Sequence, residues 1–74
     1  MKERILEILK NIRSDVDFEN EKELIDEGII ESFDVIQIVT ALMEEFSIDI
    51  EASDIESENF NSLEDICALV ESKL

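Results

Sequence analysis

The stretch DEGIIESFDVIQ, residues 26–37, holds the residues that are best placed to carry chemistry in this sequence. Gly28, the only glycine, lies four residues before Ser32, and an apolar pattern with helical spacing begins just after this serine. A serine at such a boundary is an ordinary helix N-cap, worth about 1 kcal/mol. It also suits a phosphate ester, because the free N–H groups and positive dipole end of a helix stabilise an anion. The residues alone support both roles about equally, and one serine can fill both.

The neighbours of Ser32 are unusual for a simple cap. Val35, three residues later, is apolar, so no reciprocal capping box with Ser32 is expected. Glu31 and Asp34 add negative charge on both sides, and Phe33 places a large apolar side chain beside an exposed loop. These features leave room for a functional role beside capping.

Residues for nucleophilic catalysis are missing. The sequence has no histidine, so neither a Ser–His nor a Cys–His pair can form. Cys67 falls on the apolar face of the last expected helix and is interpreted as a small core residue. Carboxylate pairs occur at almost any spacing among 21 acidic residues, and such short helices offer no obvious cleft for acid–base catalysis. We therefore expect no catalytic residues and no enzyme activity.

One acidic loop has the length of a calcium-binding loop. The stretch DVDFENEKELID places acids at ligand positions 1, 3, 5, 7, 9 and 12, namely Asp15, Asp17, Glu19, Glu21, Glu23 and Asp26. Asn20 replaces the glycine that position 6 requires, and Asp26 replaces the bidentate glutamate of position 12. The loop is interpreted as solvated, with weak nonspecific binding of divalent cations and no specific metal site.

The net charge of −15 is unevenly distributed along the 74 residues. Residues 1–13 carry four basic and two acidic side chains, whereas residues 14–72 carry 19 acidic side chains against Lys22 alone. Such a surface repels nucleic acid phosphates and anionic lipids, and it attracts basic protein patches or cations. Nucleic acid is therefore not expected as a partner.

Three apolar stripes with helical spacing predict three main helices, at residues 2–13, at residues 32–46, and from Ser62 to the end. At Ser62, Asp65 completes an S-x-x-D capping box. The absence of proline and the single glycine disfavour an all-β fold. Because the three stripes can close only on each other, the expected fold is all-α: a small bundle in one domain, residues 1–74.

The connections between these helices are also predicted. Residues 14–31 form a long first loop, with a short helical turn at EKELID. The stretch SDIES around Ile55 predicts a short minor helix. Apolar residues are expected to hold the first loop to the core, namely Val16, Phe18, Leu24, Ile25, Ile29 and Ile30.

Each main helix has an expected inward face. That of the second helix consists of Val35, Ile36, Ile38, Val39, Leu42, Met43 and Phe46. Its outward face consists of Asp34, Gln37, Thr40, Ala41, Glu44 and Glu45. The last helix is expected to bury Leu63, Ile66, Cys67, Val70 and Leu74.

The location of the protein is predicted from what the sequence lacks. No apolar stretch approaches the ~20 residues that span a bilayer, and charges interrupt the N-terminal apolar residues where a signal peptide would need a continuous run. A single cysteine cannot form an internal disulfide. We expect a soluble, cytoplasmic monomer.

From Leu24 to Ile50, the stretch LIDEGIIESFDVIQIVTALMEEFSIDI resembles the acyl carrier protein family, and ENFNSLEDICALVESKL is similar to the way such chains end. In that family an Asp-Ser-Leu or Asp-Ser-Met triplet begins the second helix, and its serine carries a 4′-phosphopantetheine arm donated by coenzyme A. Here the triplet reads Glu31-Ser32-Phe33, which keeps the acid and the apolar contact. The resemblance implies that Ser32 bears the arm, which holds acyl groups as thioesters.

The resemblance also implies partners, namely a phosphopantetheinyl transferase, an acyl- or aminoacyl-loading ligase, and synthases and transferases with basic docking patches. The residues expected to contact them are Glu31, Phe33, Asp34, Gln37, Glu44, Glu45 and Ile55. Exposed charge pairs contribute little each, so docking should be fast, weak and sensitive to salt. A plain solvated face is the alternative interpretation of these acids.

The cargo remains open within this resemblance. DEGIIES resembles the DGILDS pattern of D-alanyl carrier proteins, which serve teichoic acid modification in the cell wall, and of stand-alone carriers of peptide-type synthesis. ALMEEFSIDI and the acidity resemble carriers of fatty-acid or polyketide synthesis. Outside the family, the alternative is a small acidic interaction protein with weak cation binding.

Overall fold

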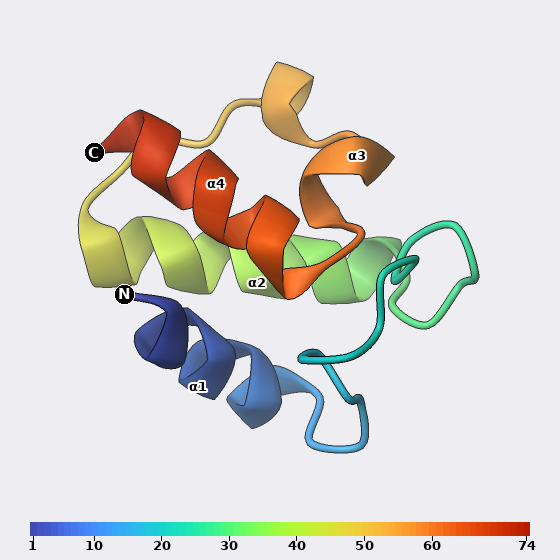
Figure 1. Ribbon diagram of the computed structural model, residues 1–74. Helices are drawn as coiled ribbons and strands as arrows, with labels where there is room; N and C mark the ends of the chain where they lie inside the picture. The colour runs from blue at the N-terminus through green and yellow to red at the C-terminus, as the bar shows by residue number, and fades with distance from the viewer.

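A computed structural model describes all residues 1–74 as a set of helices joined by loops, without strands (Figure 1). The elements are α1 (Lys2–Ile12), α2 (Ser32–Phe46), a 3₁₀ turn (Ala52–Asp54), α3 (Ser57–Phe60) and α4 (Leu63–Lys73). The predicted all-α bundle of three main helices, one short helix and a long first loop is confirmed. Figure 1 shows α2 across the middle, between α1 on one side and α4 on the other. None of the helices is both long and apolar enough to cross a membrane.

The core forms where the apolar stripes of α1, α2 and α4 meet. These helices contribute Ile5, Leu9, Val35, Ile38, Val39, Leu42, Leu63, Ile66, Leu69 and Val70, all buried. Burying each such aliphatic side chain stabilises the fold by roughly 1.5–3 kcal/mol. The stripes therefore decide how the helices pack, as their spacing predicted.

The long first loop is held in place by its apolar residues and by one asparagine. Val16, Phe18, Leu24 and Ile30 are buried in the same core as the helices. The Asn61 side-chain oxygen accepts the backbone N–H groups of Ile25 and Asp26, at 3.0 and 3.1 Å. The short helical turn expected at EKELID is a single turn, in which the Glu27 N–H donates to the Glu23 carbonyl at 2.9 Å. The loop thus has a defined path without any helix of its own.

Three details differ from the predictions. Two concern burial, which depends on what packs opposite a side chain, and the third concerns the cap of α4. Ile36 was expected to face inward but is 59% exposed, because no other segment packs over its side chain. Leu74 lies beyond the last turn of α4 and is 65% exposed. Ser62 caps α4 by accepting the Asp65 backbone N–H at 3.1 Å, which is one half of the predicted box, and the helix begins at Leu63.

The predicted minor helix lies a few residues further along the chain. Ile55 is not part of a helix, because it ends the 3₁₀ turn and precedes α3. Phe60, the last residue of α3, is buried, and this contact fixes where the short helix sits.

Every lysine and arginine forms an ion pair with an acidic side chain. The pairs are Lys2–Glu64, Arg4–Glu45, Lys10–Glu19, Arg13–Asp15, Arg13–Asp34, Lys22–Glu64 and Lys73–Asp54. Six of the 21 acidic side chains take part, so 15 have no cationic partner. The side-chain charge that remains unpaired is therefore entirely negative.

Candidate functional site

Ser32 is the first residue of α2, and the residue before it is the N-cap. Glu31 has extended backbone angles, and its N–H donates to Asp34 Oδ2 at 3.0 Å. Capping, one of the two roles considered for Ser32, is therefore not found, since the acids at N-cap and N3 form the capping interaction that Val35 could not provide. The Ser32 hydroxyl takes part in no side-chain hydrogen bond and is exposed to solvent. Capping by the two acids leaves this oxygen free to react.

Asp34 points into the protein rather than outward. Its side chain is 14% exposed, and Asp34 Oδ2 accepts Arg13 Nη1 at 2.8 Å. The same guanidinium binds both carboxylate oxygens of Asp15, at 3.0 and 2.9 Å. The hydrogen bond with Asp15 raises the pKa of Arg13, and the hydrogen bond with Arg13 lowers the pKa of Asp15. Asp34, expected on the outward face as a docking acid, instead links α1 to the first turn of α2.

Gly28 shapes the turn that leads to Ser32. Its φ is 71°, in the left-handed region that other residues rarely adopt, and its N–H donates to the Ile25 carbonyl at 3.0 Å. The turn closes with a bond from the Ile30 N–H to the Leu24 carbonyl, also at 3.0 Å. This geometry brings the chain back to the core immediately before α2 begins.

Gly28→Ala is expected to lower stability by about 1 kcal/mol through backbone strain alone, because nothing lies within 4 Å of the added Cβ. For a domain of this size, that corresponds to a fall of about 4–8 °C in Tm, measured by circular dichroism. Gly28→Asn should lose less, since asparagine tolerates the left-handed region. Equal losses for the two variants would contradict an origin in backbone strain.

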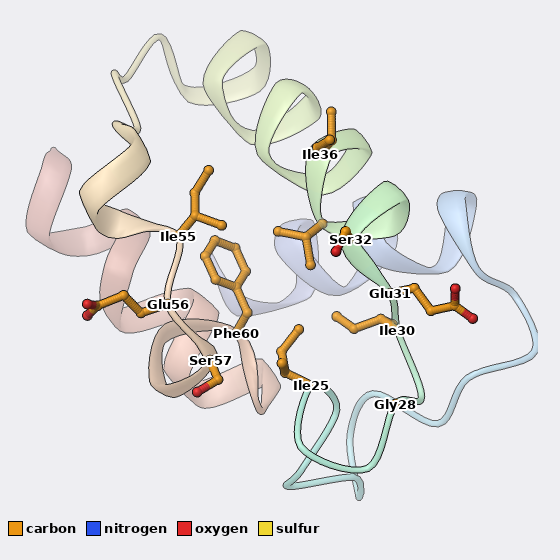
Figure 2. Close-up of a pocket in the computed structure, with 11 residues that line it drawn as sticks. Ile25, Gly28, Ile30, Glu31, Ser32, Ile36, Ile55, Glu56, Ser57 and Phe60 are labelled. Atoms are coloured by element: carbon orange, nitrogen blue, oxygen red, sulfur yellow. The ribbon is translucent and has the colours of Figure 1, made fainter.

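A pocket of about 570 Å³ opens beside Ser32 (Figure 2). It lies between the first loop, the start of α2 and the segment that contains α3. In Figure 2, the side chains of Ile55 and Phe60 face Ser32 across the pocket. Six of its eleven lining residues are hydrophobic, and the full lining is Ile25, Gly28, Ile30, Glu31, Ser32, Val35, Ile36, Ile55, Glu56, Ser57 and Phe60. We call this cavity the Ser32 pocket.

The far wall of the Ser32 pocket is tied to the end of α4. Lys73 Nζ lies 2.7 Å from Asp54 Oδ2, which also accepts the Glu51 N–H at 2.9 Å. Asn59 Nδ2 donates to the Asp54 carbonyl at 2.8 Å. The hydrogen bond from Lys73 lowers the pKa of Asp54 and raises that of Lys73. These bonds place Ile55 opposite Ser32, an arrangement that the sequence did not indicate.

The other predicted contact residues fall into two groups. Phe33, Gln37 and Glu44 are exposed on α2, Glu31 is exposed just before it, and Ile55 is 42% exposed across the pocket. The most exposed large apolar residue of the molecule is Phe33, at 70%. Glu45, in contrast, is ion-paired with Arg4. A mixed apolar and acidic surface therefore surrounds Ser32.

The structure offers neither a metal site nor an activated cysteine. No group of three or more histidine, cysteine, aspartate or glutamate side chains is arranged to hold a metal ion. Cys67 is half-buried on α4, and burial raises the pKa of its thiol. This thiol is therefore not activated as a nucleophile.

The structure thus holds an unbonded serine hydroxyl to solvent at the start of a helix, beside an apolar pocket. The family model described as "Phosphopantetheine attachment site" matches residues 2–70, and the chain belongs to this family. Such a domain is the site of covalent 4′-phosphopantetheine attachment, and it marks a carrier protein that is not itself catalytic. Neither a search of curated proteins nor a search of solved structures gave a match.

Proposed function

We propose that Ser32 carries the 4′-phosphopantetheine arm and that the protein is a discrete acyl carrier. The observation that supports this most strongly is the free, exposed hydroxyl at the first position of α2. In the modification, Ser32 Oγ gives its proton to the transferase and forms an ester bond to phosphorus, while the pyrophosphate bond of coenzyme A breaks and the nucleotide leaves. The unpaired N–H groups of the first turn then stabilise the phosphate anion.

The surroundings of Ser32 fit the arm. The hydroxyl is exposed, open space lies beside Gly28, and the apolar pocket adjoins both residues. When attached, the arm supplies a terminal thiol that holds an acyl group as a thioester. The protein's own contribution is to present the arm and to shelter what it carries.

The cargo that this pocket favours is aliphatic. Each methylene moved from water into an apolar pocket contributes about 0.8 kcal/mol, whereas burying an ammonium group without a partner is unfavourable. One feature favours the aminoacyl alternative, because Glu31 and Glu56 are among the lining residues and their negative charge at the rim would attract an amine. The hydrophobic lining is the larger part, so we place the protein in fatty-acid, polyketide or related synthesis in the cytoplasm.

A comparison of loaded proteins tests this cargo. The octanoyl-loaded protein is expected to melt at least about 4–8 °C above the unloaded holo protein, which corresponds to about 1 kcal/mol, and a D-alanyl load should change Tm little. Ile55→Ser, in the pocket wall, should reduce the rise, and Leu74→Ser, an exposed leucine outside the pocket, should not. Equal shifts for the octanoyl and D-alanyl loads would contradict an aliphatic cargo.

The surface around Ser32 is the proposed docking site for the transferase, loading ligase and synthases. Phe33 and Ile55 would give apolar contacts, and Glu31, Glu44 and Gln37 would meet basic or polar groups of the partner. Most of these side chains are exposed and unpaired, so their attraction to a partner enzyme is screened by salt. The partner can therefore dissociate readily. Glu45 could join them only by exchanging Arg4 for a partner's cation.

A further inference from the structure

Arg13 joins three segments of the chain at the base of α2. It follows the last residue of α1, and its guanidinium binds Asp15 through two hydrogen bonds. Nη1 also donates to Asp34 Oδ2 at 2.8 Å and to the Ile29 carbonyl at 3.4 Å. One side chain thus connects the end of α1, the end of the long loop and the first turn of α2.

The interactions of Arg13 continue to both sides of Ser32. Asp34 Oδ2 accepts the Arg13 guanidinium and also the backbone N–H of Glu31, at 3.0 Å. Glu31 and Asp34 lie one residue before and two residues after Ser32, so they bracket the residue that presents the hydroxyl. A planar guanidinium fits this arrangement because its donors have a fixed geometry, which a lysine ammonium lacks.

The positive charge of Arg13 also offsets the negative charge of Asp34 near Ser32. Without it, the carboxylate of Asp34 would stand unpaired in the first turn of α2, beside that of Glu31. A phosphate group approaching Ser32 would then meet two negative charges at the end of a helix that otherwise favours anions. Arg13 pairs with one of them.

We propose that Arg13 is a positioning residue for the modification of Ser32, acting through Asp34 and the N-cap of α2. The proposal rests on Ser32 being the attachment site. Arg13 holds the first turn of α2 in one conformation and offsets the Asp34 carboxylate, so that Ser32 Oγ is presented to the phosphorus of coenzyme A. It does not itself touch the reacting atoms.

The test measures phosphopantetheine transfer by a broad-specificity transferase with coenzyme A and Mg²⁺. Arg13→Gln is expected to lower kcat on the order of 10- to 100-fold, because small misplacements of a reacting group have effects of this size. The KM for the carrier should change less, and Arg13→Lys should restore part of kcat. Lys10→Gln is the matched control, since it also removes one positive charge near the end of α1. Lys10 pairs only with Glu19, at 3.9 Å.

A second measurement does not depend on modification. In the unmodified protein, the ¹⁵N order parameters of Glu31 to Asp34 should fall in Arg13→Gln from about 0.85 toward 0.6, and those of the buried Ile38 and Leu42 should not change. If the wild type is not modified but the order parameters fall as stated, the attachment site is wrong and with it the role of Arg13 in modification, although Arg13 still orders the first turn of α2. Order parameters that stay unchanged, or that fall throughout the bundle, would overturn the role of Arg13. So would equal rates for Arg13→Gln and Lys10→Gln while the wild type is modified.

Discussion

Replacing Ser32 by alanine is expected to abolish phosphopantetheine addition completely. The proposed reaction would form a bond to Ser32 Oγ, and no other hydroxyl of the molecule lies at the start of a long helix beside the apolar pocket. Ser57 offers a matched control, because it is also exposed, also begins a helix and also lines the pocket. Ser57→Ala should therefore be modified as fully as the wild type.

Intact mass after incubation with coenzyme A, Mg²⁺ and several transferases gives the readout. The wild type and Ser57→Ala should each gain the mass of one phosphopantetheine, and Ser32→Ala should gain none. Both variants replace an exposed side chain without hydrogen bonds, so their Tm values should stay close to that of the wild type. Modification of Ser32→Ala would place the arm elsewhere, and an unmodified wild type would favour the acidic interaction protein.

The second large effect is on stability, which should rise with ionic strength. Fifteen carboxylates have no cationic partner within a molecule measuring 27 × 24 × 19 Å. The Debye length is about 30 Å at 0.01 M salt and about 10 Å at 0.1 M, so added salt screens repulsion across the whole molecule. We expect a gain of at least about 1 kcal/mol, or about 4–8 °C in Tm, between these conditions.

Two variants with glutamine in place of glutamate separate the repulsion among unpaired carboxylates from the loss of an ion pair. Glu23→Gln combined with Glu27→Gln removes two exposed, unpaired charges, so it should raise Tm at low salt and reduce the response to salt. Glu64→Gln removes the partner of Lys2 and Lys22, and it should lower Tm instead. Thermal melts in NaCl and in MgCl₂ check both. A Tm that responds neither to salt nor to the double substitution would show that self-repulsion is not significant.

The helices were predictable because their signal is local. The apolar residues of the second helix repeat with helical spacing, and its predicted bounds, residues 32–46, agree with the structure. Several loop residues were also predicted correctly to reach the core, among them Phe18 and Leu24. Several large apolar side chains in one long loop favour burial against the core, because burying each of them removes apolar surface from water.

The candidate site was predicted only in part. The position and exposure of Ser32 agree with the prediction, but its capping role does not, because Glu31 and Asp34 perform it. The sequence contains this pair of acids three residues apart, but glutamate is not among the residues preferred at an N-cap, whereas serine is. Ile55, predicted as an apolar partner contact on a minor helix, is exposed, but the helix begins two residues later.

The sequence by itself determined the class of fold, the acidic surface and the serine at the start of the second helix, since each depends on composition or on residues within a few turns. Only the tertiary structure decided that Arg13 meets Asp34, 21 positions away, and that Ile55 and Phe60 close an apolar pocket opposite Ser32. Periodicity predicts which face of a helix is buried, but not which distant segment covers it. That choice is made when all the apolar stripes pack together, and here it leaves one side of the start of α2 uncovered beside the Ser32 hydroxyl.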